Sequence, residues 1–325
     1  MKILFGVQGT GNGHLSRAKE VIPYLLKYGE VDLYVSGTEA EVKLPYPIKY
    51  KKHGISFVFG QKGGIDVLKT LRILRPIRLF RDLKNCPIKN YDIIINDYEP
   101  ITAWACKMRG MPCYGLSHQG AYLSEKSPRP TKIMRYGEWF LKQYAPVSSI
   151  QAFHFARYDD FINTPVIRSG IRQMKATQQD HIAVYLPSMS DKKLVAIFSK
   201  IRTIRWKVFS KRTKKYYVEG NVEIFPVSGI EWEKALASCE GAVMGAGFEG
   251  PAEALFLKKK LFVVPMFMQY EQQCNAASLE KIGVRVAWKI RATFEDELRD
   301  WLRQVKIIKV DYPDETDLII QRIFK

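Results

Sequence analysis

The chain lacks long hydrophobic runs, and this limits how it can meet a membrane. No uninterrupted apolar stretch reaches about 18 residues, the length that a membrane-spanning helix requires. The segment Met1–Val7 is too short for the apolar core of a secretion signal and runs straight into a glycine-rich loop, so we expect a first strand there. These absences predict a cytoplasmic protein whose membrane contact, where it has one, is peripheral and on the inner face.

Cysteine pairs and metal-ligand patterns are also missing. The five cysteines include no C-x-x-C pair and their number is odd, which is typical of free thiols in a reducing compartment and argues against a structural zinc site. No Asp-x-Asp pair stands at the end of a predicted strand. We therefore expect no catalytic metal and no bound cofactor.

Acidic residues are few beside basic ones, 33 against 51, and the formal net charge is +18. Such a surplus attracts nucleic acid, an anionic membrane surface or a phosphorylated small molecule. Because RNP, zinc-finger and helix-turn-helix signatures are absent, nucleic acid is not an expected partner.

Short aliphatic segments alternate along the chain with longer segments of helical periodicity, such as 16–28 and 99–109. The predicted strands are Ile3–Val7, Val31–Ser36, Asp92–Ile95, Pro112–Leu116, Ile182–Leu186, Trp206–Ser210, Val222–Phe225, Gly241–Met244 and Leu261–Val264. This alternation predicts an α/β fold with parallel sheets and helices on both faces. The pattern restarts after the aperiodic segment 163–172. We therefore expect two Rossmann-like doubly wound domains, residues 1–165 and 166–325, that face each other across a cleft, with the last helix able to pack back on the first domain.

The most informative motif lies in the second half, where a turn of small residues opens a helix at 245–253. Backbone N–H groups at such a helix start can face a phosphate, and Glu253, one turn further on, can accept both hydroxyls of a ribose. After the next predicted strand, carboxylate and amide side chains follow that can bind sugar hydroxyls. The residues expected to hold a nucleotide sugar here are Gly247, Phe248, Glu249, Gly250, Glu253, Glu271, Gln272 and Asn275.

A second glycine-rich loop, with Gly11, Asn12 and Gly13, follows the first predicted strand. It does not fit the dinucleotide pattern G-x-G-x-x-G, because His14 stands where the third glycine belongs. We expect His14 near the start of the first helix and facing the cleft, where an imidazole can accept a proton at neutral pH. The alternative is a helix-start histidine bonded to local backbone.

Asp97 is expected just past the strand 92–95, on the same sheet edge as His14. A carboxylate there can orient the imidazole and stabilise its cation. The alternative is that Asp97 caps the helix that begins near Pro100. Glu99 is a weaker candidate for the orienting role.

Together these motifs resemble the GT-B superfamily of nucleotide-sugar glycosyltransferases, especially the UDP-glycosyltransferases and the transferase that adds N-acetylglucosamine to make lipid II. The loop 9–14 is similar to the acceptor-side loop with its histidine, and Asn96-Asp97 to the position that partners it. Residues 164–168 are similar to the linker, 247–253 to the donor helix with its ribose-binding glutamate, and 271–276 to the sugar-contacting segment. The resemblance implies that backbone near Phe225 and Val227 reads the base.

The resemblance also implies an inverting, metal-independent transfer from a nucleotide sugar, with UDP as the expected nucleotide, to an acceptor hydroxyl that is lipid-linked in one relative. His14 would take the hydroxyl proton with help from Asp97. Two positions differ from the family pattern. Gly245 stands where many relatives carry a histidine, and 186–191 replaces a Gly-Gly-Ser-type loop, so phosphate contacts fall to Ser188, Ser190, backbone groups or a basic side chain elsewhere.

Basic and apolar residues alternate in the segment 66–84, which Pro76 is expected to divide into two short helices. The basic residues are Lys69, Arg72, Arg75, Arg78, Arg81 and Lys84. This composition suits an anionic membrane surface that carries a lipid-linked acceptor; the alternative is surface helices whose leucines face the core. The segment 137–144 is a second candidate contact, and the basic cluster 211–215 is expected to be a solvated turn, with phosphate or lipid contact as the alternative.

Two other functions stay open on this fold, a sugar-nucleotide 2-epimerase and a non-catalytic nucleotide-sugar-binding protein. An epimerase needs further acid–base groups in the cleft, and the evident candidates are His118, Glu99 and Glu249. A nucleic-acid-binding protein and an NAD-dependent oxidoreductase are weaker alternatives, since neither finds its motif in the chain.

Overall fold

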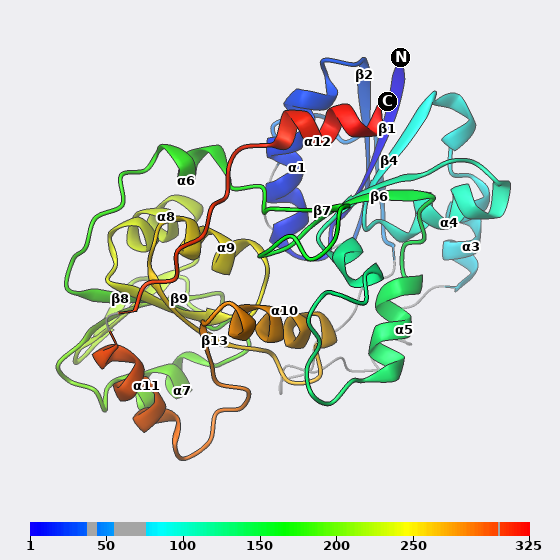
Figure 1. Ribbon diagram of the computed structural model, residues 1–325. Coiled ribbons are helices and arrows are strands. Elements are labelled where there is room, and N and C mark those ends of the chain that lie inside the picture. Colours follow the sequence, from blue (N-terminus) through cyan, green and yellow to red (C-terminus); the bar gives the residue numbers. More distant parts are fainter. Residues whose placement is uncertain (38–43, 55–75, 305) are drawn as a thin grey trace.

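The computed structural model describes residues 1–37, 44–54, 76–304 and 306–325. These residues form two lobes, each built on a sheet in which seven strands are described (Figure 1). The N-lobe sheet uses residues 2–163 and the C-lobe sheet residues 181–286. The predicted division at 165/166 lies between the last strand of the first sheet and the first strand of the second.

The N-lobe sheet has the strand order β3-β2-β1-β4-β5-β6-β7, and all its described strand pairs are parallel. Its strands are β1 (Lys2–Gln8), β2 (Glu30–Ser36), β3 (Tyr50–Lys52), β4 (Ile93–Asp97), β5 (Tyr114–Ser117), β6 (Ser149–Phe153) and β7 (Ile162–Asn163). Central strands are buried on both faces, which is why β1 and β4 are continuous apolar runs in the sequence. Because Val7 pairs with Asp97, the loops after β1 and β4 lie at one edge of the sheet.

The N-lobe helices connect these strands. They are α1 (Asn12–Leu25), α3 (Pro76–Lys84), α4 (Pro100–Arg109) and α5 (Arg135–Gln143), with 3₁₀ helices at Ile88–Asn90 and Gln119–Leu123. The helical segment expected at 16–28 begins at Asn12, so His14 lies near the start of the first helix, as predicted. Gly11 adopts φ 102°, which lets the chain turn directly from strand to helix.

The C-lobe sheet has the order β10-β11-β9-β8-β12-β13-β14, and only its described pair β10–β11 is antiparallel. Its strands are β8 (His181–Tyr185), β9 (Arg205–Ser210), β10 (Tyr217–Glu219), β11 (Val222–Pro226), β12 (Gly241–Gly245), β13 (Lys260–Val264) and β14 (Arg285–Val286). Its helices are α6 (Ser169–Gln173), α7 (Asp191–Phe198), α8 (Gly229–Ser238), α9 (Glu249–Phe256), α10 (Tyr270–Lys281) and α11 (Phe294–Arg303).

The C-terminal helix α12 (Thr316–Ile323) leaves the C-lobe and packs against α1 of the N-lobe (Figure 1). The ring of Phe324 stacks on that of Tyr28 with centroids 4.0 Å apart. Ile319, Ile320 and Ile323 belong to an apolar core that also contains residues of both sheets. The last helix therefore joins the two lobes.

Two α/β domains with doubly wound parallel sheets are confirmed, and the nine predicted strands are all present within a few residues. The prediction missed β3, β6, β7, β10 and β14. Four of these have two or three residues, and in β6 polar Ser149 and Gln151 flank Ile150, so none carries a continuous apolar run. Within the described residues, no helix combines the length and apolar character needed to cross a bilayer.

Candidate active site

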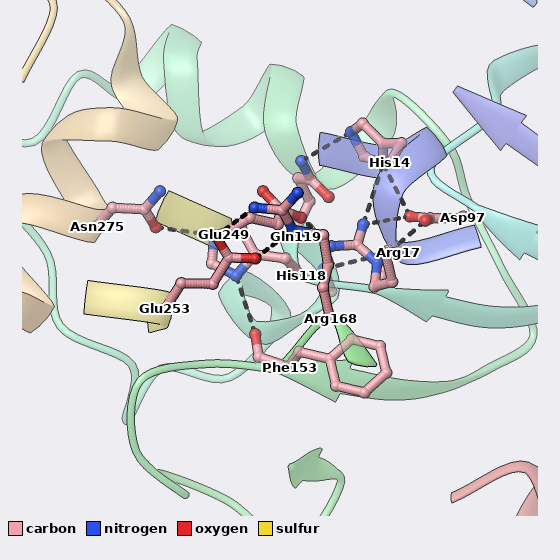
Figure 2. Close-up of polar contacts among 12 residues, drawn as sticks. His14, Arg17, Asp97, His118, Gln119, Phe153, Arg168, Glu249, Glu253 and Asn275 are labelled. Carbon is pink, nitrogen blue, oxygen red and sulfur yellow. Dashed lines mark hydrogen bonds and ion pairs between the residues drawn. The ribbon is translucent and has the colours of Figure 1, made fainter. Parts of the chain in front are cut away.

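His14 is the third residue of α1 and points toward the end of β4 (Figure 2). Its Nδ1 lies 2.9 Å from Oδ1 of Asp97, and its side chain is 12% exposed. Asp97 is the last residue of β4 and is buried. Because β1 and β4 are neighbours in the parallel sheet, the loop before α1 delivers the imidazole to the carboxylate. The structure thus brings together the two residues that the sequence predicted as a pair.

Asp97 has a second partner that the sequence analysis missed. The Arg17 guanidinium donates to both of its carboxylate oxygens, at 2.7 Å from Nη2 and 3.1 Å from Nε. Burial alone would raise the pKa of Asp97, but the charges of Arg17 and His14 outweigh burial and lower it. Asp97 is therefore ionised and can hold the imidazole. The sequence signal that could have identified Arg17 is its spacing, since it follows His14 by three residues and therefore lies on the same helix face.

Arg17 also joins the two lobes. Its Nη1 donates to Oε1 of Glu249, the first residue of α9, at 2.6 Å. Gly13 lies at the same junction, where a Cβ built on it would come within 2.4 Å of Glu249 Oε2. A larger residue at position 13 would force the Glu249 carboxylate to move, which shows how closely the loop 9–14 and α9 approach each other.

Glu99, not Asp97, caps the helix α4. Its carboxylate accepts hydrogen bonds from the backbone N–H groups of Ile101 and Thr102 at 2.8 and 2.6 Å. The alternative role of Asp97 as a cap is therefore wrong, and Glu99 is fully buried in a local network that does not include His14. This network also removes Glu99 from the acid–base groups suggested for an epimerase.

A cavity of about 500 Å³ opens between the lobes beside this network. The acceptor-side loop contributes Asn12 and Gly13, and the C-lobe contributes the predicted donor residues Gly247, Phe248, Glu249, Gly250, Glu253 and Gln272. Its remaining lining comes mainly from aromatic and small residues and one lysine, namely Tyr185, Pro187, Phe209, Lys211, Val227, Ser228, Gly229, Trp232 and Gly245. Its size and mixed lining suit a nucleotide-sized ligand.

The basic cluster 211–215 is a largely exposed turn, as expected, and its first residue, Lys211, also lines the cavity. Lys211 is therefore a candidate for the basic phosphate contact that the sequence did not locate. Ser188 does not line the cavity, although its neighbour Pro187 does. Of the two residues expected near the base, Val227 lines the cavity, whereas Phe225 stacks behind the lining residue Phe209 with ring centroids 5.2 Å apart.

Glu253 reaches the cavity from inside α9 and is almost entirely buried. Arg168 binds both of its carboxylate oxygens, with Nε–Oε1 at 2.5 Å and Nη2–Oε2 at 2.7 Å, and also pairs with Glu233. Burial raises the pKa of Glu253, and the Arg168 charge opposes that effect. Arg168, predicted only as part of the linker, therefore positions the proposed ribose-binding carboxylate.

Glu271 extends from the first turn of α10 toward His14 and its neighbour Gln119. Its Oε1 lies 3.2 Å from Nε2 of Gln119. The same amide nitrogen lies 3.3 Å from Nε2 of His14, and both of these residues are labelled in Figure 2. Burial raises the pKa of Glu271, and His14 and Gln119 partly oppose this. Gln119 was missed in the sequence, where its only signal was its place just after a strand of the same sheet edge. Gln272, by contrast, accepts from the backbone N–H of Met266 at 3.0 Å.

Asn275 is fully buried and does not line the cavity. Its amide donates to the backbone oxygen of Ala246 at 3.1 Å, and its Oδ1 accepts from Nε2 of His118 at 2.8 Å and from the Tyr122 hydroxyl. His118 also stacks on Phe248, with ring centroids 3.8 Å apart. Asn275 thus holds the lobes together and does not join the other predicted donor-binding residues at the cavity. His118 is buried against Phe248 and Asn275, which does not support the acid–base role suggested for an epimerase.

The membrane-contact candidates are only partly described. Lys69, Arg72 and Arg75 lie outside the described residues, whereas α3 carries Ile77 and Phe80 with 86% and 63% of their surface exposed. The leucines of α3 instead pack on the N-lobe core, as the alternative interpretation expected. On α5, Tyr136 and Trp139 are 90% and 65% exposed.

Metal ligands do not cluster in this part of the protein. Across the described ranges, no group of three or more His, Cys, Asp or Glu side chains could hold a metal ion. Metal independence itself stays a prediction.

Comparisons with known proteins agree with this geometry. The sequence profile described as glycosyl transferase family 1 matches residues 1–306. A search of curated proteins found no match. Among solved structures, the chain is similar to MurG of Acinetobacter baumannii (14% identity, 99% of each chain covered, TM-score 0.60). It is also similar to an indoxyl-glucosylating UDP-glucosyltransferase of Polygonum tinctorium (13% identity, 99% and 92% covered, TM-score 0.61). A third is a spinosyn rhamnosyltransferase complexed with thymidine diphosphate (12% identity, 94% and 92% covered, TM-score 0.57).

Proposed function

The chain belongs to glycosyl transferase family 1, and on that premise we propose how its cleft transfers a sugar. It is a GT-B glycosyltransferase, an enzyme that takes its sugar from a nucleotide sugar. We infer that it inverts the anomeric carbon, needs no metal ion or bound cofactor, and uses a UDP-sugar. The observation that carries the proposal is the His14–Asp97 pair on one lobe, facing the start of the donor helix α9 on the other.

In this mechanism the diphosphate lies at the start of α9, near Gly247–Gly250 and within reach of Lys211. Glu253, held by Arg168, accepts the ribose hydroxyls, and Glu271 and Gln272 bind the sugar. The acceptor hydroxyl gives its proton to Nε2 of His14 while its oxygen attacks the anomeric carbon from the face opposite the diphosphate. The helix terminus stabilises the negative charge on the departing diphosphate by about 0.3–2 kcal/mol. This is too little for catalysis by itself, so Lys211 and the His14 base are needed as well.

The acceptor that we propose is lipid-linked and reaches the cleft from a membrane bound by the N-lobe. Exposed apolar residues on α3 and α5 support this, because Ile77 and Phe80 stand beside the exposed Arg81 and Lys84 on α3. Apolar side chains ringed by cations suit an anionic bilayer surface. Soluble acceptors with the same hydroxyl chemistry are the alternative.

Donor binding is tested first, by thermal unfolding with a panel of nucleotides and nucleotide sugars. A UDP-sugar at a hundred times its dissociation constant should stabilise the protein by about 2.7 kcal/mol. Lys211→Ala should weaken binding about tenfold or more, since it removes a charge-assisted phosphate contact worth roughly 1.5–3 kcal/mol. Lys214→Ala, in the same cluster but outside the cavity lining, is the matched control. A panel in which no nucleoside diphosphate shifts the transition contradicts the proposal.

The catalytic role of His14 is tested by His14→Ala. Because general base catalysis is worth about 10²–10⁴-fold, turnover should fall at least about a hundredfold, measured as UDP release with an acceptor or, more slowly, with water. Donor affinity should stay unchanged, since His14 does not line the donor cavity. A collapse of donor affinity at unchanged turnover would assign His14 to binding instead.

A further inference from the structure

Gln119 occupies the nitrogen of His14 that the proposed reaction needs. Nδ1 of His14 lies 2.9 Å from Oδ1 of the ionised Asp97 carboxylate and 3.1 Å from Nη2 of Arg17. Because the shorter contact is to a charged acceptor, which requires a donor, we assign the proton to Nδ1 and the lone pair to Nε2. The side-chain amide of Gln119 lies 3.3 Å from that Nε2 and donates to it. A base in this state cannot accept a proton from a hydroxyl until the amide moves away.

The same amide is held from the other lobe. Its second N–H points to Oε1 of Glu271 on α10, at 3.2 Å. A carboxylate only accepts, and the imidazole lone pair only accepts, so both neighbours require the NH₂ end of Gln119 to face them. Two acceptors from different lobes thus fix one orientation of the side chain.

That orientation leaves the amide oxygen without a partner. Gln119 is 6% exposed, and its Oε1 finds no hydrogen bond among the described residues. An unsatisfied buried acceptor is costly, so the amide stays in place only while both of its N–H groups are bound. Loss of either acceptor favours rotation of the side chain.

We propose that Gln119 is a positioning residue that masks the His14 base until a donor sugar engages Glu271. This rests on the proposed function, in which Glu271 binds sugar hydroxyls. When the sugar takes over the Glu271 carboxylate, the amide loses one of its two anchors and swings away, and Nε2 of His14 is presented to the acceptor. The base is thereby made available only when the donor lobe is filled.

The test measures the reactivity of His14 in the free protein, where no donor is required. Diethyl pyrocarbonate acylates an imidazole nitrogen through its lone pair, and mass spectrometry resolves each histidine. Gln119→Leu keeps a side chain of similar size but cannot donate, so His14 should react about two- to tenfold faster, the factor expected for one neutral hydrogen bond. Glu271→Ala retains Gln119 but removes its second anchor, and should give most of that increase. The half-buried His53 is the internal reference.

Each other outcome overturns the proposal. An unchanged His14 rate in Gln119→Leu means that the amide does not mask the base. A faster rate in Gln119→Leu with a wild-type rate in Glu271→Ala means that the mask is independent of the donor lobe. The ¹⁵N resonance of His14 Nε2 gives a second measurement if one variant folds poorly, since it moves when the lone pair loses its hydrogen bond. None of these readouts uses sugar transfer, so they are decided separately from the turnover of His14→Ala.

Discussion

Arg17 balances the charge of the cleft because it lies between carboxylates of both lobes. It is 3% exposed and donates to Asp97 and Glu249, which neutralises part of the negative charge where a diphosphate is proposed to lie. Burial lowers the pKa of Arg17, but the two carboxylates outweigh burial and raise it. The guanidinium therefore stays charged and ties α9 to Asp97.

Arg17→Met is predicted to destabilise the protein by about 3–5 kcal/mol, because it leaves Asp97 as an uncompensated buried charge. Urea unfolding measures this. Adding Asp97→Asn should restore part of the loss, so the double variant is more stable than the sum of the two single changes. Asp317→Asn breaks the exposed pair with Lys27 and serves as the control that leaves the midpoint unchanged. A strictly additive cycle would contradict this account.

His14, Asp97 and Glu253 could be predicted because each stands at a fixed offset from a strand end or helix start in the sequence. Spacing places Arg17 on the same helix face as His14, but the contacts of Arg17, Arg168 and Gln119 could not be predicted, since their partners are distant in the chain. Arg17 and Glu249 are 232 positions apart, and Gln119 and Glu271 are 152. Such pairs depend on how the lobes meet, and local spacing does not contain that information.

At the scale of elements, long buried strands were predictable and short edge strands were not. The parallel strands β1, β4, β8, β12 and β13 are apolar along most of their length, so the sequence marks them directly. Strands such as β7 and β14 have two residues each and exist only because a neighbouring strand offers free backbone groups. His14, Asp97 and the start of α9 follow the carboxyl ends of β1, β4 and β12, so the apolar runs that mark these strands also locate the candidate site.

The helices α3 and α5 are predicted to dock on anionic membranes. Flotation with anionic vesicles should recover the protein at low salt and less of it at high salt, because the cationic contribution is screened. Replacing Ile77 and Phe80 by serine should weaken binding about tenfold or more, since each buried side chain of this size contributes about 1.5–3 kcal/mol.

The matched control for flotation is Ile230→Ser on α8, a residue that is 61% exposed on the other lobe. It should float like the wild type. Absence of binding to anionic vesicles at low salt rules out surface docking and leaves soluble acceptors.

At the scale of the whole molecule, the interface between the N-lobe and α10 of the C-lobe contains two neutral, buried histidines, His118 and His154. Burial lowers the pKa of His118 to about 3 and that of His154 well below its usual value. His118 bonds to Asn275, and Nε2 of His154 lies 2.9 Å from the Ser278 hydroxyl, so each links the N-lobe to α10. Protonation of either ring would put an unpaired charge into this interface.

Stability is therefore predicted to fall in mild acid. Below about pH 6.5 the unfolded chain binds a proton at each of these histidines and the folded chain does not. The free energy of unfolding therefore decreases as the pH is lowered. For His118 the loss between about pH 6.5 and 5 is roughly 2 kcal/mol, measured by urea unfolding across that range. His118→Gln should lower stability at pH 7 but flatten the slope. An unchanged slope in that variant would show that His118 already takes up a proton in the folded state.

The return of α12 to α1 sets a rule for building chimaeras from this enzyme. An exchange of donor-binding halves with a relative through a single crossover near residue 165 would import a foreign terminal helix onto the native α1, where Phe324 stacks on Tyr28 and Ile320 is fully buried. A chimaera with two crossovers, one in the linker and one before Thr316, keeps the native α12 on the native α1.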